Sequence, residues 1–167
     1  LYIDALNVNA DLKTENLVTL LHWKDPRMLT HPRKSDGEPN PRVEKVIIRS
    51  SEINRFRHGE LSADAFAKIT NQIFPSGIIW QLFLFHIARP FEWPIADQHV
   101  FRSYAKLSKT TPPETLFDFH RYVAFFNQLA EQFVSRDSKN DRLLVGQRKR
   151  IDNALFAYGQ FLATYDS

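Results

Sequence analysis

Cysteine is absent from this chain of 167 residues. Its absence excludes disulfide bridges, cysteine-bound zinc, iron–sulfur clusters and a thiol nucleophile. A chain without cysteine fits the reducing cytoplasm, which is the expected location. Lysine is also missing between Lys68 and Lys106. The centre of the chain therefore offers no lysine amine for Schiff-base chemistry.

Long hydrophobic runs are missing as well. The most apolar stretch is IIWQLFLFHIA at residues 78–88, and a membrane-spanning helix needs about 18 or more apolar residues. We therefore expect no membrane partner. Hydrophobic residues nevertheless make up 43% of the chain, which is typical of a globular protein with a packed core. The formal net charge of +3 and the pI of about 9.2 mildly favour a polyanionic partner.

Apolar residues recur at helical spacing along most of the chain, and the strand signal is weak. The sequence therefore predicts an all-α protein with about seven helices, of which the middle three form the core. We expect one helical domain over residues 1–167, with room for two lobes, centred on residues 62–110. Residues 26–41 are rich in proline, which predicts a loop with Arg33 and Lys34 at its tip. The predicted helices cover residues 15–23, 42–56, 63–74, 78–88, 98–108, 114–135 and 148–165.

The stretch that follows the most apolar helix concentrates polar chemistry. Asp97, His99 and Arg102 occur close together after a proline-containing loop, at the start of the helix expected over residues 98–108. Aspartate is among the best N-cap residues, so Asp97 is expected to cap this helix. A carboxylate at a helix N-terminus is also held in its ionised form. Such a carboxylate can stabilise the positive charge that develops on a sugar during glycosidic cleavage. The cap and the catalytic interpretation are compatible.

The order of turn, apolar helix, loop and Asp97-x-His99-x-x-Arg102 resembles the helix-hairpin-helix DNA glycosylases of the endonuclease III-like (HhH-GPD) superfamily, in a divergent bacterial branch. The resemblance takes Gly77 as the second glycine of the hairpin and covers the region from Phe74 to Lys106. It implies a glycosylase-like fold of two helical lobes around a central buried helix. It also implies that Asp97 is the catalytic carboxylate.

Two departures from the family pattern limit the chemistry that the resemblance implies. Pro75 stands in place of the first hairpin glycine, and Ile79 stands where bifunctional members carry a lysine. An isoleucine cannot form a Schiff base, so lyase chemistry at that position is excluded. The cysteine-bound cluster of some members is absent too. The remaining pattern is that of a monofunctional glycosylase, or of a related fold without catalysis.

The other candidate site residues each have a structural alternative. His99 and Arg102 share a helix face and are candidates for phosphate contact, or they are a hydrogen-bonded histidine and a surface arginine. Ser76 and Gly77 can offer a phosphate the N–H groups of a helix start, or they form an ordinary turn. Three residues are candidates for stacking on or reading an extruded base, although tryptophan in such a helix is more often core: Trp80, Gln81 and Trp93.

No metal site is expected, because Asp97 and His99 supply two ligands, with His86 the only further candidate nearby. No cofactor is expected. The leading hypothesis is a DNA-binding, base-excision glycosylase-like protein that hydrolyses an N-glycosidic bond. The partner would be DNA, bound weakly and without sequence preference. The alternatives are a non-catalytic module that binds nucleic acid or another protein, and a purely structural helical module.

Overall fold

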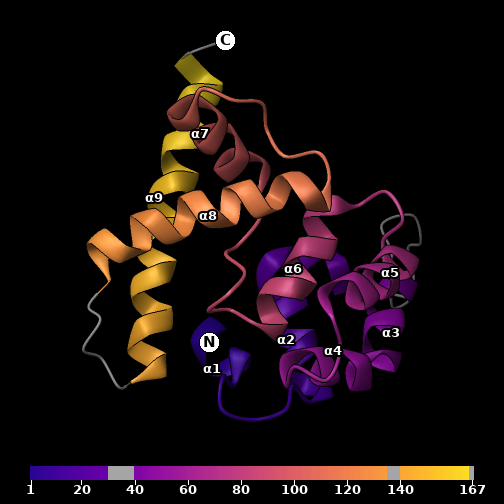
Figure 1. Ribbon diagram of the computed structural model, residues 1–167. Helices are drawn as coiled ribbons and strands as arrows, with labels where there is room; N and C mark the ends of the chain where they lie inside the picture. The colour runs from indigo at the N-terminus through magenta and orange to yellow at the C-terminus, as the bar shows by residue number, and fades with distance from the viewer. Residues whose placement is uncertain (30–39, 135–139, 166–167) are drawn as a thin grey trace. The chain divides into compact units, whose positions relative to one another are not determined.

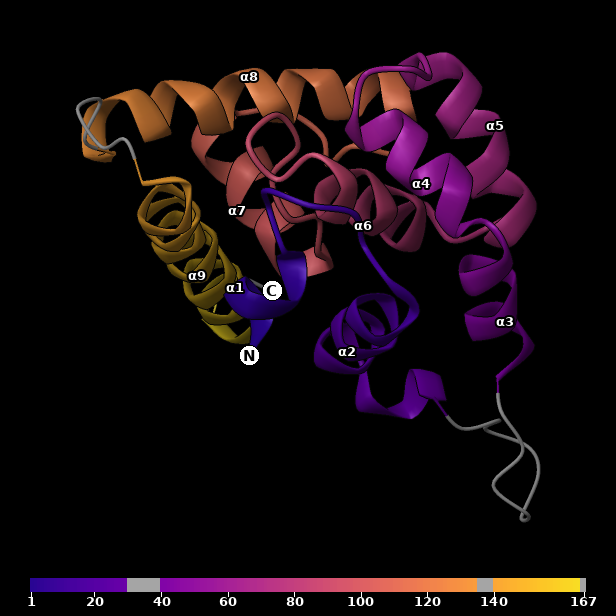
Figure 2. The same cartoon turned by 90° about the horizontal axis from the view of Figure 1, so that it is seen from below.

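The computed structural model describes residues 1–29, 40–134 and 140–165, apart from the side chains of Leu116 and Phe117. Every regular element in these ranges is helical (Figures 1 and 2), which confirms the all-α prediction. The loop tip at Arg33 and Lys34 lies outside the described residues. The elements are α1 (Tyr2–Leu6), α2 (Thr14–Lys24), the 3-10 turn η1 (Pro26–Leu29), α3 (Pro41–Ile48), α4 (Ser50–Arg57), α5 (Ala63–Ile73), α6 (Ile78–Ala88), α7 (Gln98–Ser108), α8 (Leu116–Phe133) and α9 (Asp141–Tyr165).

The chain divides into two compact units. The first unit comprises residues 1–77 and 87–89, and the second comprises residues 78–86 and 90–167. Two of the predicted helices, over residues 78–88 and 98–108, have the observed bounds of α6 and α7. The prediction of α6 as a buried helix is confirmed for Leu82–Ala88, whereas its first turn, Ile78–Gln81, is half-buried.

The helix predicted over residues 42–56 is interrupted. Arg49 leaves the helical conformation at φ −93° and ψ 16°, so that α3 ends before it and α4 begins after it. The break precedes the pair Ser50–Ser51, and serine hydroxyls compete with the backbone for helical hydrogen bonds. Helix α1 was not predicted either, because five residues are too few to establish a period.

The helices of the first unit are held together by side-chain hydrogen bonds to backbone groups and by ring contacts. Asn54 of α4 accepts a hydrogen bond from the Leu12 N–H at 2.9 Å and donates one to the Leu12 carbonyl at 3.1 Å. The rings of Phe56 and Phe66 stack at 4.2 Å between centroids and join α4 to α5. These contacts fix α4 at the centre of the unit, between residues that are distant in the sequence.

The charged guanidinium of Arg57, at the end of α4, is surrounded by backbone carbonyl groups. Its guanidinium donates to the carbonyls of Leu6 at 2.8 Å, Asn7 at 2.5 Å and Ile87 at 3.1 Å. Burial lowers the pKa of Arg57, and the nearby charge of Asp11 partly opposes this effect. Leu6 and Ile87 are in the last turns of α1 and α6, where carbonyl groups lack helical partners and attract a cation.

Replacement of Arg57 by methionine should therefore destabilise the protein. Hydrogen bonds to charged donors contribute more than neutral ones, and partly buried carbonyls would lose their partner. We expect a loss of about 2–3 kcal/mol in the free energy of unfolding, measured by urea denaturation. Arg55→Met is the matched control, since Arg55 is exposed and its nearest carboxylate, Glu60, is 3.9 Å away. An equal loss in both variants would contradict the role assigned to Arg57.

Candidate functional site

The segment between α6 and α7 is anchored at two of its carbonyl groups. His86 Nδ1 lies 2.6 Å from the Trp93 carbonyl oxygen, and the Tyr122 hydroxyl donates to the Ile95 carbonyl at 3.3 Å. The Trp93 ring lies parallel to Phe119, with centroids 5.8 Å apart, and packs on Phe85 at 4.5 Å. The segment therefore reaches the start of α7 in a defined conformation.

Asp97 is the N-cap of α7, as predicted. Its carboxylate accepts a hydrogen bond from the backbone N–H of His99 at 2.9 Å. Its backbone is extended, at φ −155° and ψ 153°, which is the ordinary geometry of an N-cap residue. The residue is only half-buried. Asp97 therefore combines the cap of α7 with partial exposure to solvent.

His99 and Arg102 act together at the crossing of α7 and α9. Arg102 Nη1 lies 3.0 Å from His99 Nδ1 and donates to the Gly159 carbonyl at 3.1 Å. A guanidinium has donors alone, so Nδ1 of His99 is the acceptor. The His99 ring also meets Phe156 edge-on, at 5.1 Å between centroids. Both side chains therefore help to hold α7 on α9, and Arg102 is half-buried against α9 instead of being a surface arginine.

Gly159 is the residue that permits this crossing, and sequence reasoning missed it. A Cβ at position 159 would lie 1.8 Å from the backbone oxygen of His99. Nearby, Ser103 Oγ donates to the Leu155 carbonyl at 2.5 Å. Figure 1 shows α7 beside the C-terminal part of α9. A lone glycine inside a predicted helix was the available signal, because it costs stability unless a close approach requires it.

The remaining candidate residues have different surroundings. Ser76 is exposed and Gly77 donates its N–H to the Phe74 carbonyl at 3.1 Å, which forms a turn in the first unit. Trp80 and Gln81 are half-buried on the first turns of α6 in the second unit, with Trp80 edge-on to Phe83. Trp93 is 6% exposed and belongs to the core. An extruded base could stack on Trp93 only after repacking of that core.

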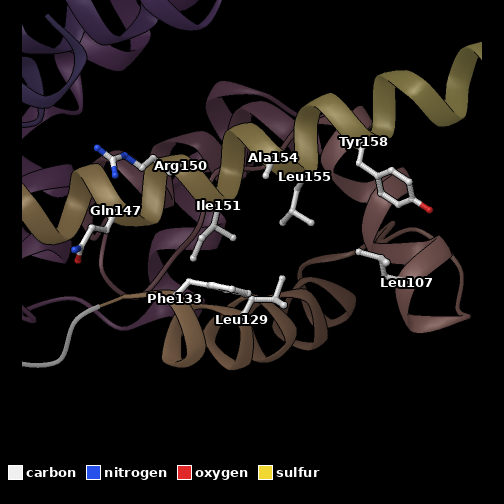
Figure 3. Close-up of a pocket in the computed structure, with 9 residues that line it drawn as sticks. All are labelled: Leu107, Leu129, Phe133, Gln147, Arg150, Ile151, Ala154, Leu155 and Tyr158. Carbon is white, nitrogen blue, oxygen red and sulfur yellow. The ribbon is translucent and has the colours of Figure 1, made fainter.

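The described side chains of the second unit also form a groove. It has a volume of about 510 Å³ and lies between the end of α7, the end of α8 and one face of α9 (Figure 3). Asp97 is not among the residues that line it. The sequence did not predict this groove. Its lining residues are Leu107, Leu129, Phe133, Gln147, Arg150, Ile151, Ala154, Leu155 and Tyr158.

Other site classes find no support in residues 1–29, 40–134 and 140–165. Within these ranges, no group of three or more histidine, aspartate or glutamate side chains is arranged to hold a metal ion. No helix there is long and apolar enough to cross a membrane. Comparison with known proteins gave no match to a family model, to a curated protein or to a solved structure.

The close crossing at Gly159 predicts a large effect of one methyl group. Gly159→Ala should cost about 3 kcal/mol in the free energy of unfolding, although alanine is the better helix former, because the obstacle is backbone. Thermal and urea denaturation measure the loss. Ala157→Gly is the control on the exposed side of the same turn and should lose about 1 kcal/mol through helix propensity alone. A more stable Gly159→Ala protein would rule out the close approach.

The burial of Tyr122 leads us to expect that the protein loses stability at alkaline pH. Burial raises the pKa of this tyrosine well above its ordinary value of 10.0, and the nearby Asp152 adds to the effect while Arg148 opposes it. Below pH 10 the group is neutral in both states and contributes no pH dependence. Above pH 10 the unfolded state ionises and the folded state does not, so stability falls by up to about 1.4 kcal/mol per pH unit.

The Tyr122→Phe variant isolates this contribution. We expect it to lose about 1 kcal/mol at pH 8 with the hydrogen bond to Ile95, and to lose less stability than the wild type between pH 10 and pH 11. Urea denaturation at the three pH values measures both effects. Parallel stability curves for the two proteins would show that Tyr122 ionises while folded.

Proposed function

We propose that the protein is a glycosylase-like, DNA-binding hydrolase of N-glycosidic bonds, with Asp97 as its catalytic carboxylate and without lyase activity. The observation that carries the proposal is the position of the half-buried Asp97 as the N-cap of α7. Two further features support it. The segment before Asp97 is anchored through Trp93 and Ile95, and α7 itself is fastened to α9 through Arg102.

The chemistry requires one negative charge and a water molecule. As the bond between the base nitrogen and the sugar C1′ breaks, positive charge develops on the sugar, and the ionised Asp97 stabilises it. Water adds its oxygen to C1′ and gives up one proton, while the departing base takes up one proton. No amine is needed, so Ile79 is compatible with this reaction. The products are a free base and an intact strand with an abasic sugar.

The proposal gives the other candidate residues secondary roles. His99 and Arg102 are positioning residues, because their hydrogen bonds are directed to each other and to α9. Ser76, on the turn before α6, is exposed and can contact phosphate through its hydroxyl, whereas the N–H of Gly77 is bonded to the Phe74 carbonyl. Trp80 and Gln81, half-buried on the first turns of α6, are the residues assigned to the base.

A non-catalytic binding module on the same glycosylase-like fold is the second candidate function. The apolar groove between α8 and α9 favours it, since such a groove suits a protein partner. In that case Asp97 serves as a helix cap alone. The two functions make opposite predictions for Asp97.

Asp97→Asn separates the charge from the cap. Asparagine caps a helix about as well as aspartate, so we expect the thermal midpoint and the DNA affinity to stay at wild-type values. Base release should fall at least about 100-fold with the lost charge. The assay follows base release from labelled duplexes that carry modified bases, with and without alkali. The wild-type product should remain uncut until alkali is added.

Duplex binding is measured for both proteins by fluorescence anisotropy at two salt concentrations. We expect weak affinity that falls steeply with salt, because cationic side chains release counterions from the phosphates. Strand cleavage without alkali would point to an amine nucleophile in place of Asp97. Full activity of Asp97→Asn, or no wild-type activity on any substrate, would leave the carboxylate as a cap and favour the non-catalytic module.

A further inference from the structure

The groove in the second unit has the form of a helix-binding surface. The residues of α9 that line the groove follow one another at intervals of three or four positions: Gln147, Arg150, Ile151, Ala154, Leu155 and Tyr158. This is the spacing of one helix face, and it extends over about 16 Å of helix axis. Figure 3 shows Ile151 and Leu155 directed from α9 toward Leu129 and Phe133 of α8. Such a face accommodates a second helix with apolar anchors at matching intervals.

The walls of the groove are apolar and accessible. Phe133 is 70% exposed at the end of α8, and Leu107 is 51% exposed at the end of α7. A contiguous apolar groove of this kind exposes hydrophobic surface that a partner can remove from water. Gln147 adds a polar feature, since its buried Oε1 accepts no hydrogen bond from a described residue.

Arg150 gives the lining of the groove a positive charge. Arg150 is the one charged residue among the described residues that line it, and Figure 3 draws its guanidinium at the rim, away from Leu129 and Phe133. No described carboxylate lies within ion-pair distance of Arg150. Beyond the lining, the exposed Lys109 follows Leu107 and the exposed Glu131 precedes Phe133. A partner with negative charge on its polar face complements this rim.

From the spacing, the exposed apolar walls and the cationic rim, we propose that the groove between α7, α8 and α9 binds an acidic amphipathic helix of a partner protein. The apolar face of that helix packs on Phe133, Leu107 and Ile151, and its carboxylates lie near Arg150 and Lys109. This interaction is independent of the reaction assigned to Asp97, which is not among the residues that line the groove.

The test uses the whole chain and a defined probe. A fluorescein-labelled synthetic peptide of about 14 residues carries leucine at the i, i+3, i+4 and i+7 positions and glutamate on the opposite face. A twin peptide carries lysine in place of every glutamate. Fluorescence anisotropy should show that the glutamate peptide binds about tenfold more tightly than its twin at low salt, with the difference reduced at high salt.

Four variants locate the binding site. Phe133→Ser should weaken binding of the glutamate peptide about tenfold through the lost apolar contact, whereas Phe161→Ser, at another exposed aromatic residue outside the groove, should leave it within about twofold. Arg150→Glu should reduce the preference for glutamate over lysine about fivefold. Lys68→Glu makes the same change of charge on α5 and should retain the preference. Circular dichroism verifies the folding of each variant.

Three results would overturn the proposal. The first is equal affinity for the two peptides, and the second is full binding by Phe133→Ser. The third is a wild-type dimer in sedimentation equilibrium that Phe133→Ser dissociates, since the occupant of the groove would then be a second copy of this chain. A monomeric wild type that binds the glutamate peptide selectively through Phe133 and Arg150 supports the acidic helix.

Discussion

The contact between α7 and α9 at Gly159 is the constraint on which the second unit depends. The backbone of His99 occupies the space that a side chain at position 159 would fill. Because the two helices lie so close together, the hydroxyl of Ser103 and the guanidinium of Arg102 both donate hydrogen bonds to carbonyl groups of α9. Backbone sterics thus set the spacing of the helices, and hydrogen bonds then fix their register. Asp97 takes its position from this arrangement, because it caps the helix that is fastened there.

The polar residues at the start of α7, Asp97, His99 and Arg102, therefore have two structural roles. Asp97 satisfies a backbone N–H at the end of the helix, whereas His99 and Arg102 hold the body of the helix in place. A catalytic group needs such support, since a small displacement of a carboxylate weakens its stabilisation of developing charge. The same arrangement would also stabilise a protein with no catalytic role. These contacts explain how Asp97 is held in position. They do not bear on the reaction that we propose for it, which depends on a substrate.

The apolar groove illustrates the opposite situation, in which packing is incomplete. Helix α9 buries Val145, Leu155 and Leu162, yet Phe133 and Leu107 beside it remain exposed. In the first unit, by contrast, Arg57 and Asn54 satisfy carbonyl groups of distant segments, and Phe56 lies fully buried. Other apolar side chains are exposed elsewhere, such as Ile48 and Phe161, but Phe133 and Leu107 line a concave surface, and this is the surface for which we propose a partner.

The sequence by itself determined the helical class, the bounds of α6 and α7 and the capping role of Asp97, because these depend on local periodicity and on one side chain near one backbone N–H. It could not determine the break at Arg49, because the apolar residues before and after Arg49 together fit one continuous helix. Tertiary structure alone decided the partners of His99 and Arg102, the burial of Trp93 and the groove beside α9. Each of these depends on which helix faces meet, and the contacts that bring them together, such as His99 with Gly159, join residues far apart in the chain.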